Sequence, residues 1–242
     1  MKNIENQLTA LRLHGMNHAW QTLVETRRHQ DLSFMEGLDV LLQAEQQQRE
    51  QNRFERLRKN ARFRYQASIE ELHLEPSRGI GKDQITTLAQ GAYLQAGESI
   101  LITGATGCGK SFIASALGHQ ACRQGYKVAY FNVQKMMQKM KIARLEGTIH
   151  KFFEKMAKTD LLILDDFGLT PLARQQQLDI MELIEDRHAR KSTIIASQLP
   201  VASWFDVMGE ATVADAILDR LVHTSHRIEL KGESLRKTHN KT

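Results

Sequence analysis

The sequence predicts an α/β fold, in which a mostly parallel sheet covered on both faces by helices follows a small all-helical domain. Two observations predict it. Before residue 76, apolar residues recur at helical spacing. After residue 97, short runs rich in leucine and β-branched residues alternate with helical stretches, which is the pattern of a parallel sheet with helical crossovers. The five strand candidates are residues 99–103, 127–131, 161–165, 193–197 and 227–230.

The first 75 residues read as amphipathic helices. Ser33 and Glu36 have the spacing of a capping box, so a helix is expected to begin at Phe34. The helical pattern continues to Arg64. We therefore expect residues 1–75 to form a helical domain.

Residues 49–64 carry seven basic side chains against two glutamates. Clustered lysine and arginine neutralise phosphates, so this stretch predicts salt-dependent DNA binding with little sequence preference. The alternative is a solvated amphipathic helix packed on the second domain. The DNA-contact candidates are Arg49, Arg53, Arg56, Arg58, Lys59, Arg62 and Arg64. A second basic stretch on the same path would consist of Lys135, Lys139, Lys141 and Arg144.

A glycine-rich stretch, residues 76–97, is expected to connect the helical domain to a second domain at 98–242. The stretch therefore marks a boundary between domains.

Composition points to a soluble, cytoplasmic globular protein. Apolar residues make up 41% and charged residues 25% of the chain, which is enough for a packed core. Cys108 and Cys122 bracket an expected helix and lie too far apart to bridge, and free thiols fit a reducing compartment. No run could span a membrane, and no signal-peptide pattern opens the chain. The formal net charge of +5 is too mild to identify a partner.

Residues 104–111, Gly-Ala-Thr-Gly-Cys-Gly-Lys-Ser, match the phosphate-binding loop pattern at every fixed position, between an expected strand and a helix expected at 112–124. Glycine lets the backbone wrap phosphate oxygens, Lys110 reaches the outer phosphates, and Ser111 ligates magnesium. ATP and magnesium are therefore the expected cofactors, and residues 98–242 are the expected ATPase domain. Residues between Gly79 and Gly97 are the natural candidates for contacts to the nucleotide base. The alternative is a glycine-rich turn that happens to precede a lysine. The expected nucleotide contacts are Gly104, Ala105, Thr106, Gly107, Cys108, Gly109, Lys110, Ser111 and Phe112.

Two adjacent carboxylates, Asp165 and Asp166, end the strand candidate 161–165. Ligands in open α/β sheets lie beyond the carboxyl ends of the strands, so the pair is expected there. We assign Asp165 to magnesium and Asp166 to polarising the attacking water. An ordinary acidic turn is the alternative. Because the run 127–131 lies between the two motifs in sequence, we expect an additional strand between the halves of the site, which is typical of mechanical P-loop ATPases.

Two further polar residues are catalytic candidates. Gln198 follows the fourth strand candidate and would touch the γ-phosphate or orient water, or else only shape the turn before Pro200. Arg220 would reach the ATP of a neighbouring subunit as an arginine finger, or else pair with Asp219 on the surface. With these two, the catalytic candidates are Lys110, Asp166, Gln198 and Arg220.

In order along the chain, these motifs resemble those of the IstB-like family of insertion-sequence helper ATPases, relatives of the DnaC and DnaA branch of AAA+ proteins. The likeness covers nearly the whole chain. It is carried by residues 11–16 (LRLHGM), 32–34 (LSF), 104–111, 118–126 (GHQACRQGY), 160–166 (DLLILDD), 197–200 (SQLP), 218–223 (LDRLVH) and 228–234 (IELKGES).

The resemblance implies a homo-oligomer that binds ATP and duplex DNA, assembles on the DNA and deforms it. It then presents this target to a transposase encoded beside it, with ATP binding and hydrolysis as the assembly switch. Three alternatives stay open: a DnaC-like loader of a replicative helicase, a small-molecule P-loop kinase, and a DNA scaffold that binds ATP without hydrolysing it. The kinase is disfavoured, because no arginine-rich lid segment follows the second motif.

Three features depart from the usual AAA+ pattern. Asp166 stands where glutamate is usual, and Gln198 stands where asparagine is frequent. The shorter carboxylate predicts slow hydrolysis. Twelve residues follow Leu230, too few for a full C-terminal helical lid. Arg236 is therefore expected in a solvated tail rather than as a nucleotide sensor.

Overall fold

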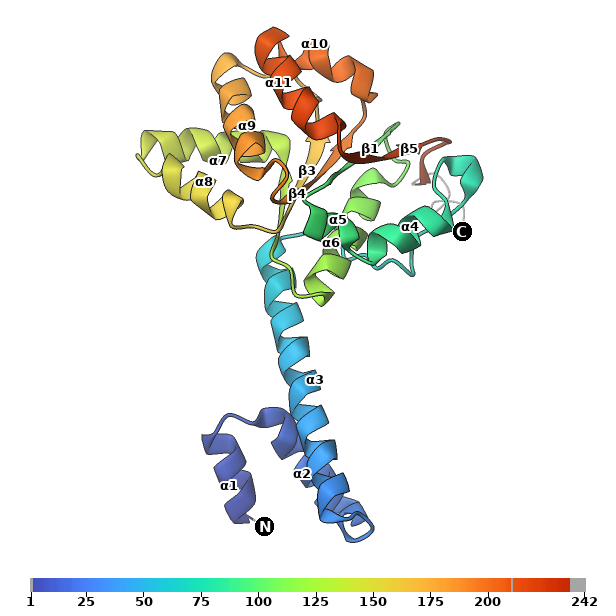
Figure 1. Ribbon diagram of the computed structural model, residues 1–242, viewed down its shortest axis with the longest axis vertical. Helices are drawn as coiled ribbons and strands as arrows, with labels where there is room; N and C mark the ends of the chain where they lie inside the picture. Colours follow the sequence, from blue (N-terminus) through green and yellow to red (C-terminus); the bar gives the residue numbers. More distant parts are fainter. Residues whose placement is uncertain (1, 210, 236–242) are drawn as a thin grey trace. The chain divides into compact units, whose positions relative to one another are not determined.

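The structure is a computed structural model, and it describes residues 2–209 and 211–235 (Figure 1). The chain divides into two compact units, residues 1–56 and 57–242. Each unit is described by itself below. Among the described residues, no helix is both long and apolar enough to cross a membrane.

The first unit is helical. It holds α1 (Lys2–Ala10), α2 (His14–Glu25), a 3-10 turn (Arg28–Gln30) and most of α3 (Phe34–Ala61). The predicted capping box is present and α3 begins at Phe34: the Glu36 carboxylate accepts from the Ser33 N–H at 2.8 Å, and the Ser33 hydroxyl accepts from the Glu36 N–H at 3.3 Å.

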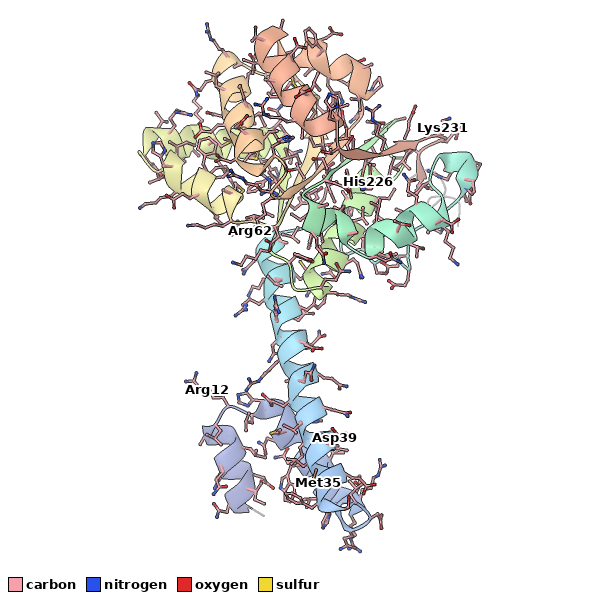
Figure 2. All side chains as sticks on the ribbon, in the orientation of Figure 1. Arg12, Met35, Asp39, Arg62, His226 and Lys231 are labelled. Atoms are coloured by element: carbon pink, nitrogen blue, oxygen red, sulfur yellow. The ribbon has the colours of Figure 1, made fainter. Side chains whose placement is uncertain are left out.

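The predicted end of this helix at Arg64 is wrong. α3 ends at Ala61, and Arg62 takes a left-handed φ of 59°, which stops the helix (Figure 2). Arg62 and Arg64 therefore lie beyond the helix. The remaining members of the basic stretch lie within it.

α2 packs closely on α3 through Gly15. A Cβ at this position would lie 2.4 Å from the carbonyl oxygen of Ala44, so only glycine fits without separating the helices. The Glu45 carboxylate accepts from the backbone N–H groups of Gly15 at 2.8 Å and Met16 at 3.2 Å. A side chain of α3 thus satisfies donors in the first turn of α2, a role that the N-cap residue Leu13 cannot fill.

The second unit is built on a five-stranded sheet with the order β2-β3-β4-β1-β5, in which every pairing is parallel. All five predicted strands are confirmed. They are β1 (Ser99–Gly104), β2 (Val128–Asn132), β3 (Leu161–Phe167), β4 (Ser192–Ser197) and β5 (Ser225–Leu230).

The predicted extra strand between the two motifs is present, but it is β4 and not the run 127–131. That run forms β2, which lies at the edge of the sheet and pairs with β3. β4 pairs with β1 on one side and with β3 on the other. The residue that follows β4 therefore lies between the phosphate loop and the acidic pair.

Helices cover both faces of the sheet (Figure 1). On one face lie α4 (Lys82–Ala89), α5 (Ala92–Ala96) and α6 (Lys110–Arg123). The other face carries α7 (Val133–Leu145), α8 (Ile149–Ala157), α9 (Arg174–Arg187), α10 (Trp204–Met208) and α11 (Ala211–Val222). Buried side chains of β1, β3 and β4, such as Leu101, Leu162 and Ile195, join the second group in one apolar core.

The expected connector, residues 76–97, contains α4, α5 and the short 3-10 turn Pro76–Arg78. A second 3-10 turn, Val201–Ser203, precedes α10. Within the described part of the chain, no α-helix follows β5. Cys108 and Cys122 are both buried free thiols, as expected.

Candidate functional site

The loops that follow β1, β3 and β4 meet at the carboxyl edge of the sheet, where they border a pocket of about 950 Å³. This is the size of a site for a small organic ligand. The residues that line it are Arg64, Tyr65, Glu71, His73, Glu75, Arg78, Thr106, Gly107, Gly109, Lys110, Ser111, Phe112, Asp166, Gln198 and Leu235. The pocket therefore joins the phosphate loop to the acidic pair.

Three glycines give the phosphate loop its shape. Gly104, Gly107 and Gly109 have φ values of 144°, 83° and 103°, which side chains rarely allow. α6 begins directly afterwards at Lys110, so its unpaired N–H groups and positive dipole end lie at the loop. The Lys110 ammonium donates to the carbonyl oxygens of Gly104 and Ala105, both at 2.8 Å. The Lys110 ammonium therefore already lies at the loop, where it could bind an anion.

Asp165 is buried, with an exposed fraction of 1%, and it contacts Ser111, the residue that follows Lys110. The Ser111 hydroxyl donates to Oδ1 of Asp165 at 2.9 Å, and the Tyr130 hydroxyl donates to Oδ2. Burial, together with the adjacent Asp165 carboxylate, raises the pKa of Tyr130, so the phenol keeps its proton and donates it. A hydroxyl and a carboxylate oxygen this close are the protein ligands that magnesium takes in phosphate-loop sites.

Asp166 has a left-handed φ of 58°, and the pairing of β3 with β4 is irregular between Leu164 and Phe167. In a regular strand, adjacent side chains point to opposite faces. The bulge instead lets two successive carboxylates serve the same edge. Asn132, at the end of β2, donates from Nδ2 to the Asp166 carboxylate at 2.8 Å.

Arg64 contacts both carboxylates. Its Nη1 lies 3.4 Å from Oδ2 of Asp165 and 3.2 Å from Oδ2 of Asp166. Burial alone would lower the pKa of Arg64, but Tyr65 and the two carboxylates outweigh it and raise the pKa. This arginine, expected on DNA, thus lies at the nucleotide pocket.

The other two catalytic candidates lie in different places. Gln198 reaches the phosphate loop, where its Oε1 accepts from the Thr106 hydroxyl at 2.7 Å. Arg220 is not a lining residue of the pocket. Its Nε pairs with the Glu185 carboxylate at 2.5 Å, and the expected alternative partner, Asp219, lies 3.1 Å from His223 instead. Arg236 lies outside the described residues.

Several pocket residues had no signal in the sequence analysis. Base contacts were expected from residues 79–97, but none of these residues lines the pocket. Besides the phosphate loop, Phe112, Asp166, Gln198 and Leu235, the lining comes from residues 64–78. Leu235 also lines the pocket, and its N–H donates to the carbonyl oxygen of Gly107 at 3.0 Å. The aromatic-basic run Phe63-Arg64-Tyr65, read as the end of a helix, was the available clue.

The remaining DNA-contact candidates divide between the units. Arg49, Arg53 and Arg56 belong to the first, while Arg58, Lys59 and Arg62 belong to the second. All except Arg58 are exposed, and Arg49 also pairs with Glu45 at 2.7 Å. These exposed side chains can reach phosphates.

Comparison with known families gives a match over most of the chain. The sequence profile of the family described as "IstB-like ATP binding protein" matches residues 6–242. An insertion-sequence ATP-binding protein of Sinorhizobium fredii (strain NBRC 101917 / NGR234) is 40% identical over 232 residues, which cover 96% of this chain and 95% of that protein. The IS1162 ATP-binding protein of Pseudomonas fluorescens is 41% identical over 196 residues, 81% of this chain and 85% of that one.

Solved structures share the fold. The DnaC helicase loader superposes with a TM-score of 0.58 at 21% identity, covering 68% of this chain and 97% of that one. DnaI gives a TM-score of 0.60 at 17% identity, covering 72% of this chain and 94% of that one. At such identities the likeness concerns the fold alone. It confirms the predicted α/β architecture as a DnaC-like AAA+ core.

Proposed function

Because this chain belongs to the family of IstB-like ATP binding proteins, an insertion-sequence helper family, we propose that it hydrolyses ATP and prepares duplex DNA for a partner transposase. In this proposal it assembles on the duplex, deforms it and presents it as the target. The observation that supports ATP binding and hydrolysis is that the phosphate loop and the acidic pair lie together. The Ser111 hydroxyl is 2.9 Å from the buried Asp165 carboxylate.

The phosphate loop, Asp165, Asp166 and Gln198 each have a part in this proposal. The glycine backbone and Lys110 would bind the β- and γ-phosphates, and Ser111 and Asp165 would hold magnesium, which neutralises charge on the transferred phosphoryl group. Asp166 would accept a proton from the attacking water, and Gln198, hydrogen-bonded to Thr106, would orient that water. These roles suit the placement of the side chains around one pocket.

Slow hydrolysis follows from the acid at position 166. An aspartate is one methylene shorter than glutamate, and this one already accepts from Asn132 and Arg64. Both donors bind its Oδ2, and hydrogen bonds to the ionised carboxylate make it a weaker base for the proton of the water. ATP would therefore remain bound long enough to act as a signal for assembly, with hydrolysis ending it.

Contacts to duplex DNA are assigned to the exposed basic residues of the stretch 49–62. Arginine and lysine side chains neutralise backbone phosphates without reading the bases. The DNA would thus be chosen with little sequence preference. Arg64 is left out of this set, because its guanidinium is engaged with Asp165 and Asp166.

The test is to image the protein on duplex DNA with ATP, without nucleotide, and as two variants. Wild type with ATP is expected to form assemblies that bend the duplex. Lys110→Ala removes the phosphate-binding ammonium and is expected to form none. Asp166→Asn keeps ATP binding but slows hydrolysis by roughly 100-fold, so its assemblies should outlast those of wild type.

Two outcomes would contradict the proposal. If Lys110→Ala assembled on DNA as wild type does, ATP would not control assembly. If the protein bound single strands and a hexameric helicase, but neither duplex DNA nor a transposase, the helicase-loader alternative would replace it.

A further inference from the structure

Arg64 holds the acidic pair loosely. The two distances from its Nη1, 3.4 Å to Asp165 and 3.2 Å to Asp166, exceed the roughly 2.7–2.9 Å of strong charge-assisted hydrogen bonds. Its side chain is 43% exposed. Water screens such a pair, so its net contribution is small. Another cation could therefore displace the guanidinium at little cost.

The backbone that carries Arg64 is held by its aromatic neighbours. The ring of Phe63 stacks on His119 of α6 with centroids 4.3 Å apart. The ring of Tyr65 lies against Phe112, also on α6, at 6.1 Å. Both anchors pack on the helix that begins at the phosphate loop. Release of the carboxylates then needs only a rotation of the Arg64 side chain.

The position of the guanidinium is chemically specific. Asp165 turns one carboxylate oxygen to Ser111 and the other to Arg64, and Asp166 turns an oxygen to the same Arg64 nitrogen. Asp165 is the carboxylate that a divalent cation would use, and Asp166 lies beside it on the same arginine. Two uncompensated carboxylates at the end of the phosphate loop would repel an incoming triphosphate, and one guanidinium offsets half of their charge.

We propose that Arg64 is the resident counter-cation of the acidic pair, and that a divalent metal ion arriving with the nucleotide displaces it. The proposal rests on the nucleotide site described under the proposed function. It predicts that Arg64 assists nucleotide binding when metal is absent and opposes metal binding when metal is present. A residue that simply holds phosphates would assist in both conditions.

The test uses Arg64→Gln, with Mn²⁺ as the probe and a non-hydrolysable ATP analogue. Free Mn²⁺ is followed by electron paramagnetic resonance at saturating analogue, and analogue binding in EDTA is followed by calorimetry. The variant is expected to bind Mn²⁺ roughly fivefold more tightly, and the analogue in EDTA roughly fivefold more weakly, since exposed ion pairs contribute about this much. Arg64→Lys, which keeps the charge, should lie between the variant and wild type.

The matched control is Arg190→Gln, which removes an exposed arginine outside the pocket lining and should leave both affinities unchanged. Equal thermal unfolding of both variants and wild type would show that the fold is intact. Unchanged Mn²⁺ affinity in Arg64→Gln would overturn the proposal, and so would weaker analogue binding both with and without metal. A wild-type protein that bound no analogue would overturn the proposed function itself, and this inference with it.

Discussion

Tyr130 orients Asp165 through a hydrogen bond and does not itself line the pocket. Its hydroxyl donates to Oδ2 of Asp165, and its ring packs edge-on against Phe63 at 6.3 Å. Burial and the Asp165 carboxylate raise its pKa, so it remains a donor at neutral pH. A partner of this kind fixes the direction of a metal-binding oxygen without touching the metal.

Tyr130→Phe is therefore expected to weaken Mn²⁺ binding at saturating ATP analogue by about tenfold, the usual cost of losing an outer-shell partner. The ring and its packing are retained, so the free energy of unfolding should change little. The control is Tyr126→Phe, on the loop before β2. This weaker Mn²⁺ binding is opposite to the tighter Mn²⁺ binding expected for Arg64→Gln, although both residues contact Asp165. Unchanged Mn²⁺ affinity would mean that Ser111 alone orients this carboxylate.

At this scale, the parts of the site that lie close together in sequence were predictable, and the parts that converge by folding were not. The phosphate loop and the acidic pair could be read because each is a short run with fixed spacing. Arg64 lies 101 residues before Asp165 in the chain, and Asn132 lies 34 residues before Asp166. The residue types do not mark these partners, since arginine and asparagine are common at element ends, and only the aromatic neighbours Phe63 and Tyr65 set Arg64 apart.

At the scale of elements, α2 and α3 are held together by Glu45. Its buried position alone would raise the pKa of its carboxyl, but hydrogen bonds from Arg49, Met16 and Gly15 outweigh this and lower the pKa. A carboxylate with a lowered pKa stabilises the fold above its unfolded pKa. This stabilisation is lost as pH falls through the folded value.

Glu45→Gln is expected to destabilise the helical unit by about 1 kcal/mol at pH 7. The difference from wild type should shrink as the pH falls below about 4.3, the ordinary glutamate value, and through the lowered pKa of the folded state. Thermal unfolding of the full chain, followed by circular dichroism at several pH values, measures it. Glu25→Gln, an exposed residue of the same unit, is the control. A difference that stayed constant with pH would contradict a role for the charge.

The elements themselves show what periodicity can and cannot predict. The strands were found because buried parallel strands are continuous apolar runs. The end of α3 was misplaced because Tyr65, four residues after Ala61, continues the apolar stripe at helical spacing, although it and Phe63 lie beyond the helix. Instead they pack on α6 from a non-helical segment, against His119 and Phe112. Tertiary contacts, which periodicity does not see, replaced the helical ones.

The order of the strands is a property of the whole molecule, and this is why β4 was not foreseen between β1 and β3. The rule for connections between parallel strands fixes their handedness, but it does not say how many strands lie between the two that are connected. Charge is also distributed at this scale. The formal net charge of +5 is modest, yet basic residues gather in the C-terminal part of α3, where residues 49–61 carry five of them against two glutamates. Their location rather than the total should therefore govern contact with DNA.

The effect of where the basic residues lie can be separated from the effect of the total charge. Arg53 and Arg56 are exposed and three residues apart, so they share one face of α3. Replacing both with glutamine lowers the formal net charge from +5 to +3. If each contacts a phosphate, the slope of log K against log salt for duplex binding should fall by about 2. Replacing Lys151 and Lys155, exposed on α8, changes the charge equally and should leave the slope unchanged. Equal falls for both pairs, measured by fluorescence anisotropy at several salt concentrations, would mean that overall charge carries the binding.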